Sequence, residues 1–131
     1  MDELVRWLGK QLDEDERIAR AACEGGEGRW QALGNEHGGY VAGDHEGYHV
    51  AYDEGYPTLE QATHIAEWDP ARVLREIEAR RAIVDDLTEE IRWAARMSHD
   101  YQDGANACER TLKRLALPYA DRSGYREEWR P

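Results

Sequence analysis

The sequence predicts an α+β fold that is mostly helical, in which three main helices pack with a small antiparallel β-hairpin or three-strand meander. Three observations support this prediction: helical spacing of apolar residues at both ends of the chain, a glycine-rich middle, and an Asp-Pro helix start. A length of 131 residues suits one domain, 1–131. Its predicted parts are an N-terminal helix (1–23), a glycine-rich acidic β segment (24–56), a helical region (57–118) and an aromatic C-terminal strap (119–131).

The N-terminal helix is predicted from Leu4, Leu8 and Leu12, which recur every four residues among charged side chains. The run Glu24-Gly25-Gly26 ends that pattern, because glycine is a poor helix former.

The middle segment holds nine of the twelve glycines, and its seven acidic residues against one arginine give it a net charge of -6. Short apolar runs predict strands at 30–33, 39–42 and 48–52. Gly34-Asn35 and Gly43-Asp44 supply turn residues that tolerate positive φ. This pattern favours a hairpin or meander over a disordered segment.

The helical region begins with Thr58 and Gln61, which have the spacing of a capping box. Asp69-Pro70 then predicts a long helix to about His99, since Asp caps a helix and Pro is tolerated at its first position. Asp103-Gly104 is expected to break it. A last helix is expected from the capping pair Asn106 and Glu109 to Pro118.

Arg80 falls within the apolar seam of the long helix, where a charge is costly in a closed core. Two pairings remain open for it. An acidic residue of the N-terminal helix (Asp13, Asp15 or Glu16) would face it in an antiparallel helix pair, or the seam would form a homodimer.

A net charge of -11 argues against direct binding of nucleic acid or of an anionic membrane, and is compatible with a basic protein partner or with solubility alone. No apolar run approaches the roughly 18 residues of a membrane span, and the acidic start lacks a secretion signal. We therefore expect a cytoplasmic protein. Cys23 and Cys108 are predicted to be two small buried thiols rather than a disulfide.

His45-Glu46-Gly47-Tyr48-His49 matches the H-E-x-x-H pattern of zinc peptidases, which requires a helix to bring both imidazoles to one metal. The glycines around it predict turn and strand instead, and residues four apart on a strand are separated by about 13 Å. A peptidase is therefore not predicted, and neither a catalytic residue, a metal nor a cofactor is assigned. A weak divalent site among the hairpin histidines and carboxylates stays open.

Candidate binding residues are the aromatic and imidazole side chains of the acidic hairpin, together with one pair near the start of the long helix. The hairpin set is His37, Tyr40, His45, Tyr48, His49 and Tyr52, and the pair is His64 and Trp68.

Two parts of the chain show a distinctive pattern: residues 62–81, which include His64-Ile65-Ala66 and Asp69-Pro70-Ala71-Arg72-Val73-Leu74-Arg75, and the aromatic end, with 115–121 and 125–131. Both parts resemble an uncharacterised family of small acidic proteins of streptomycetes and their phages. Leu12-Asp13-Glu14-Asp15-Glu16-Arg17 matches the N-terminal part of that family, and together these blocks cover about half of the chain. The resemblance implies an actinobacterial or phage-associated protein and supplies no activity or catalytic residue.

The function expected from the sequence is that of a non-enzymatic binding or interaction protein of phage or prophage origin, with a protein partner. Two alternatives remain. One is an acidic decoy that mimics nucleic acid and inhibits a host DNA-binding protein; the other is a small metal-dependent hydrolase or nucleotide-binding protein.

Overall fold

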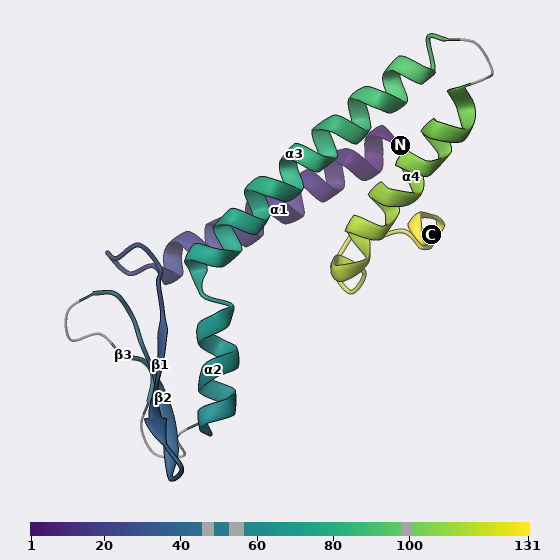
Figure 1. The fold of residues 1–131 in the computed structure, drawn as a ribbon. Coiled ribbons are helices and arrows are strands. Elements are labelled where there is room, and N and C mark those ends of the chain that lie inside the picture. The colour runs from purple at the N-terminus through teal and green to yellow at the C-terminus, as the bar shows by residue number, and fades with distance from the viewer. Residues whose placement is uncertain (46–48, 53–56, 98–100) are drawn as a thin grey trace. The chain divides into compact units, whose positions relative to one another are not determined.

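The computed structural model describes residues 1–45, 49–52, 57–97 and 101–131. Within these ranges the fold is α+β and mostly helical, as predicted (Figure 1). The order of elements is α1 (Asp2–Ala22), β1 (Gln31–Asn35), β2 (Gly38–Ala42), β3 (His49–Ala51), α2 (Leu59–Glu67), α3 (Pro70–Ala94), α4 (Gln102–Ala116), η2 (Leu117–Tyr119) and η3 (Glu127–Trp129).

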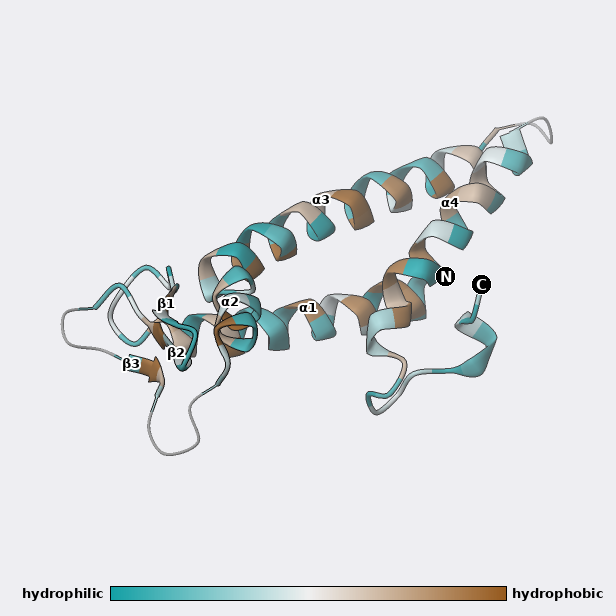
Figure 2. Ribbon diagram, turned by 60° about the horizontal axis from the view of Figure 1, so that its bottom comes forward, coloured by the Kyte–Doolittle hydropathy of each residue, from teal (hydrophilic) through white to brown (hydrophobic). Residues whose placement is uncertain are grey.

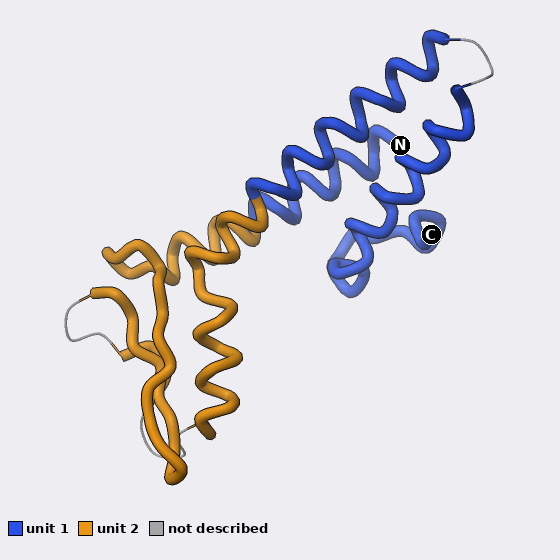
Figure 3. The backbone as a smooth tube through the Cα atoms, in the orientation of Figure 1, with its two compact units in different colours: residues 1–14, 78–131 blue, residues 15–77 orange. Residues whose placement is uncertain are grey.

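The chain divides into two compact units, shown in Figure 3. Unit 1 contains Met1–Glu14 and Glu78–Pro131, and unit 2 contains Asp15–Ile77. The two long helices α1 and α3 each contribute to both units. The assignment of the whole chain to one domain stays a prediction.

Unit 2 is built on a three-stranded antiparallel sheet with β2 at its centre. Helix α2 lies along one face of this sheet (Figure 1), and Val41 and Ala62 are completely buried. Gly39 allows the close approach, because a Cβ there would lie 3.0 Å from the Leu59 Cα and 3.1 Å from the Ala62 Cβ. The three-strand meander is thus the form that the glycine-rich segment takes.

The first hairpin turn lies two residues further along the chain than the sequence predicted. Strand β1 continues through Gly34 and Asn35, and the two loop residues are Glu36 and His37. Gly34 is extended at φ +141°, where a side chain would collide with the Gly38 carbonyl oxygen at 2.3 Å. The Asn35 side chain accepts a hydrogen bond from the His37 amide at 2.8 Å, so Asn35 stabilises the turn from the strand end.

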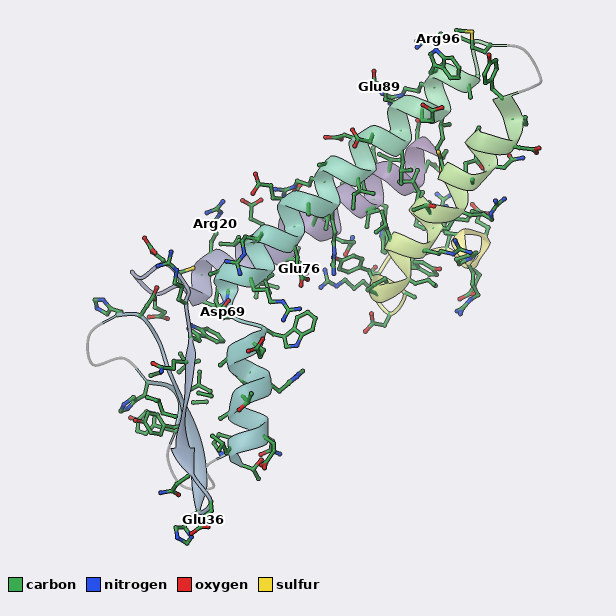
Figure 4. All side chains as sticks on the ribbon, in the orientation of Figure 1. Arg20, Glu36, Asp69, Glu76, Glu89 and Arg96 are labelled. Carbon is green, nitrogen blue, oxygen red and sulfur yellow. The ribbon has the colours of Figure 1, made fainter. Side chains whose placement is uncertain are left out.

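Both predicted helix starts in unit 2 are confirmed. The Gln61 amide donates to the Thr58 hydroxyl at 3.1 Å, and the Gln61 side chain accepts from the Thr58 amide at 2.9 Å. Asp69 lies between α2 and α3 (Figure 4), and its Oδ1 accepts from the Arg72 amide at 2.8 Å.

Asp69 also ties the first strand of the sheet to the start of α3. Its second carboxylate oxygen, Oδ2, accepts from the Trp30 amide at 3.1 Å, across 39 positions of sequence. Beside it, the Ala71 amide donates to the Gly28 carbonyl at 3.0 Å. Gly28 has φ +77°, and a Cβ there would lie 2.7 Å from both the Cys23 Sγ and the Pro70 Cβ. The segment that leads into β1 is therefore held by hydrogen bonds to the N-terminus of α3.

The core of unit 1 is formed by α1, α3 and α4. Leu4, Leu8, Leu12 and Leu112 are at most 1% exposed. Along these helices hydrophobic and hydrophilic residues alternate in the colouring of Figure 2, as the helical periodicity requires. The core thus combines two sequence-distant regions, Met1–Glu14 and Glu78–Pro131.

The predicted antiparallel pairing of the N-terminal helix with the long helix is seen within unit 1 (Figure 1). Arg81 donates to the Asp13 carboxylate at 2.7 Å. Arg80, the seam residue, donates to the Tyr119 hydroxyl at 3.1 Å, so the C-terminal segment supplies one partner for this charge. The homodimer stays a prediction.

Two predicted boundaries at the other end of the chain are wrong. Helix α3 ends at Ala94, earlier than His99, which lies outside the described residues. Helix α4 begins at Gln102, so Asp103 and Gly104 lie in its first turn instead of before it. This placement costs little, because first-turn amides have no helical acceptor and Asp is favourable near a helix N-terminus.

The aromatic strap packs back on unit 1, where Tyr119 and Trp129 are 3% and 7% exposed. Its backbone includes the short helices η2 and η3. The Trp129 ring lies 5.4 Å from that of Trp7 and 5.9 Å from that of Tyr125. The strap thus closes the end of the unit 1 core.

Cys23 and Cys108 are free and only half-buried, whereas burial was predicted. Cys23 donates to the Ala19 carbonyl at 3.4 Å. None of the helices in the described ranges combines the length and the apolar character needed to span a membrane.

Candidate functional site

Three of the six candidate residues from the acidic hairpin form one compact group, the strand cluster, which consists of Tyr40, His49 and Tyr52. Tyr40 alternates along β2 with the buried residues Gly39 and Val41, so it lies on the sheet face opposite α2. Its ring centroid is 5.3 Å from that of His49, which is 4.8 Å from that of Tyr52. Tyr52 is 57% exposed. The strand cluster is therefore a row of three rings in edge contact, with its end open to solvent.

The second group, the helix cluster, consists of His64, Trp68 and Arg72. His64 and Trp68 are one helical turn apart, with ring centroids separated by 6.3 Å. Trp68 is 47% exposed, and the guanidinium of Arg72 lies over its ring at 4.2 Å from the centroid. The junction between α2, which ends at Glu67, and α3, which begins at Pro70, therefore places a basic side chain against the exposed indole.

Arg72 is itself held in position by two neighbouring acidic residues. Its Nε donates to the Glu76 carboxylate at 3.0 Å, and its Nη1 donates to the Glu67 backbone carbonyl at 3.1 Å. Glu76 lies one turn further along α3, as Figure 4 shows. An arginine with both ends of its guanidinium engaged fixes the orientation of the indole beneath it.

His37 and His45 belong to neither cluster. His37 occupies the tip of the first hairpin beside Glu36, where both side chains are at least 85% exposed. His45 is exposed and follows β2, and Tyr48 lies outside the described residues. The structure therefore brings together five of the eight predicted residues, in two separate groups.

The described ranges 1–45, 49–52, 57–97 and 101–131 do not support a metal centre. No three of their His, Cys, Asp or Glu side chains are grouped so that they could hold an ion. His49 lies in a β-strand, so the helix that the H-E-x-x-H pattern requires is not formed at that residue. Glu46 and Asp53, two carboxylates of the hypothesised divalent site, lie outside the described residues.

Asp44 has a structural role that its place in a predicted turn only partly indicated. Its Oδ2 accepts hydrogen bonds from the amides of Glu27 at 2.9 Å and of Arg29 at 3.2 Å. Partial desolvation alone would raise the pKa of Asp44, but the backbone hydrogen bonds from Arg29 and Glu27 outweigh it and lower the pKa below its ordinary value. This carboxylate therefore joins the loop after α1 to the end of β2.

The lowered pKa predicts a loss of loop structure in acid. A group whose folded pKa is depressed contributes stability above its ordinary pKa, 3.8 for this aspartate, and this contribution is lost as pH falls through the folded value. Between pH 7 and 3, NMR should show the Glu27 and Arg29 amide signals moving together, with a midpoint below that of an ordinary aspartate. Asp44→Asn should abolish the transition, and Glu36→Gln should preserve it; a midpoint at or above the ordinary value would contradict the assignment.

Arg72 is the residue of the helix cluster that is not among the candidates predicted from the sequence. Its pairing with Glu76 at i,i+4 is typical of a solvated helix face. Its contact with Trp68 depends on how α2, which ends at Glu67, meets α3, which begins at Pro70, so no helical spacing in the sequence indicates it.

No match to the chain was found among curated proteins or among solved structures. A family model does match, over residues 1–131, and its description is a family of unknown function (DUF6221). Because the match covers the entire sequence, the chain belongs to the DUF6221 family.

Proposed function

We propose that this chain is a non-enzymatic binding protein that engages a protein partner through the helix cluster of unit 2. The observation that carries the proposal is the state of Trp68, which is 47% exposed and has the Arg72 guanidinium over its ring at 4.2 Å from the centroid. A large exposed ring forgoes the burial that a folded chain normally gives it. A partner that covers this ring would recover that burial.

Trp and Arg are the side chains that most often dominate the binding energy of protein interfaces. In the helix cluster they are already in contact, and Arg72 is fixed by Glu76 and by the Glu67 carbonyl. Fewer rotamers are therefore lost on association, which lowers the entropic cost of binding. This preorganisation distinguishes Trp68 from an aromatic residue that is merely exposed.

The charge of unit 2 favours a basic partner. Residues 15–77 contain 13 acidic and 5 basic side chains, a net charge of -8 out of -11 for the whole chain. Such a field speeds the encounter with a positively charged protein and disfavours nucleic acid. The partner we propose is therefore a basic protein with an apolar pocket for an indole.

The proposal predicts that Trp68→Ala abolishes partner capture and leaves the fold intact. Immobilised wild-type chain and variant would be compared in pull-downs from a streptomycete lysate, the source that the resemblance to streptomycete and phage proteins suggests. Loss of a hot-spot residue weakens binding by about 2 kcal/mol, roughly thirtyfold. The matched control is Tyr101→Ala in unit 1, whose ring is 46% exposed. Equal recovery of all bound proteins by Trp68→Ala and wild type would reject the helix cluster as the interface.

The charge of unit 2 also favours a second candidate, an acidic decoy of phage or prophage origin that occupies the DNA-binding surface of a host protein. The two candidates differ in salt dependence. A decoy held by charge should release its partner as salt rises, because screening weakens contacts between exposed charges. Binding through Trp68 should persist. A cytoplasmic location belongs to both proposals, and the free thiols of Cys23 and Cys108 fit a reducing compartment.

A further inference from the structure

Unit 1 contains a pocket of about 340 Å³ between one face of α1 and the C-terminal strap. That volume falls in the range of small-molecule sites. The α1 residues follow the i, i+3, i+4, i+7 spacing of a single helix face. The lining residues are Glu3, Arg6, Trp7, Lys10, Gly124, Arg126 and Trp129.

The aromatic wall of this pocket is rigidly held. The Trp7 indole nitrogen donates to the Ser123 carbonyl at 3.0 Å, and the ring packs against Trp129 at 5.4 Å. Gly124 has φ +85°, and a Cβ at this position would lie 2.9 Å from that indole nitrogen. The strap therefore has glycine where the backbone must pass close to the indole, and Trp7 presents a fixed flat surface.

The charges around this wall are predominantly positive, although the chain as a whole carries -11. Three cationic side chains and one carboxylate line the pocket, and the carboxylate of Glu3 is paired with Arg126 at 2.5 Å. Arg6 donates only to the Asp2 carbonyl, among the residues that the structure describes. Within the same ranges, Lys10 makes no hydrogen bond or ion pair. Two positive charges thus remain without a carboxylate.

We propose that this pocket binds a small organic anion that carries a planar ring. The ring packs on the indole wall, and the anionic group pairs with Lys10 and Arg6. A cation beside an aromatic surface satisfies both halves of such a ligand, since stacking recognises the ring and charge-assisted hydrogen bonds recognise the anion. Two kinds of molecule share this chemistry, nucleoside monophosphates and aromatic carboxylates. This site is independent of the helix cluster, because all its residues belong to unit 1.

The experiment titrates the full chain separately with AMP and with indole-3-acetate, and follows the Trp7 indole N–H by NMR and the affinity by calorimetry. We expect one of the two probes to shift the Trp7 signal saturably at millimolar or lower concentration. Lys10→Ala should weaken that probe about tenfold, as expected for loss of one hydrogen bond to a charged group. If AMP is the better probe, two simpler compounds should each bind more weakly than AMP. These are adenosine, which carries only the ring, and inorganic phosphate, which carries only the charge.

The matched control is Arg92→Ala, which removes one exposed positive charge that does not line the pocket. It should bind as wild type does, and so should Trp68→Ala in unit 2. The site would be rejected if neither probe shifts Trp7, or if Lys10→Ala and Arg92→Ala weaken binding equally. Because Lys10 is exposed on α1, its replacement should leave the circular dichroism spectrum unchanged.

Discussion

Asp69→Ala is expected to lower the free energy of unfolding by about 2 to 3 kcal/mol, the sum of a lost helix cap and an amide left without its acceptor. One carboxylate oxygen caps α3 through the Arg72 amide, and the other accepts from the Trp30 amide. Removal of the carboxylate therefore breaks a local and a long-range hydrogen bond at once. Urea unfolding followed by circular dichroism measures the change.

Hydrogen exchange locates the effect of this substitution. The Ala71 amide, which donates to the Gly28 carbonyl beside the cap, should exchange faster in Asp69→Ala. Asp69→Asn retains one acceptor oxygen, so its Ala71 amide should exchange at a rate between those of Asp69→Ala and wild type. The control is Asp86→Ala, an exposed aspartate within the same helix, which should change stability by no more than about 0.5 kcal/mol. Equal stabilities for Asp69→Ala and Asp86→Ala would show that the carboxylate does not join the two elements.

The features predicted correctly from sequence are those whose physical cause is local. The Thr58–Gln61 capping box and the Asp69 cap require only residues three positions apart, so the pattern itself contains both partners. The hydrogen bond from Trp30 to Asp69 depends on how the sheet returns to α3, and nothing near either residue indicates it.

The wrong boundaries come from glycines whose meaning depends on tertiary structure. Gly34 was predicted to form a turn, but it lies within β1 because Gly39 pairs with it across the hairpin. Gly104 was predicted to end a helix, and it lies in the first turn of α4 with open space around it. A glycine indicates where a side chain is dispensable, and the contacts of the fold decide whether that place is a turn, a strand or a helix start.

The same limit applies to the candidate sites. Exposed aromatic residues could be nominated from composition, and five of the eight fall into two clusters. The pocket of unit 1 could not be predicted, because its residues come from positions 3–10 and 124–129. Its α1 half does show a helical repeat of charged and aromatic residues, but only the packing of the strap turns that face into one side of a pocket.

Trp129→Ala is expected to lower the free energy of unfolding by about 3 to 5 kcal/mol, the largest effect of any substitution considered for this chain. The indole is 7% exposed and packs against Trp7 and Tyr125, so its removal leaves a cavity between two other rings. Thermal unfolding should show a marked fall in Tm, and deletion of residues 119–131, which also removes the buried Tyr119, should lower it further.

Trp68→Ala is the matched control, because it removes the same side chain from a site that is 47% exposed and should cost about 1 kcal/mol or less. The comparison separates a structural strap from a docking segment. If the strap closes the core, Trp129→Ala loses stability and Trp68→Ala loses a partner. Were Trp129→Ala to melt with the wild-type chain and to lose a partner instead, the strap aromatics would be an interface. The burial of Trp129 and Tyr119 favours the first outcome, since side chains already removed from water have little further apolar surface to offer a partner.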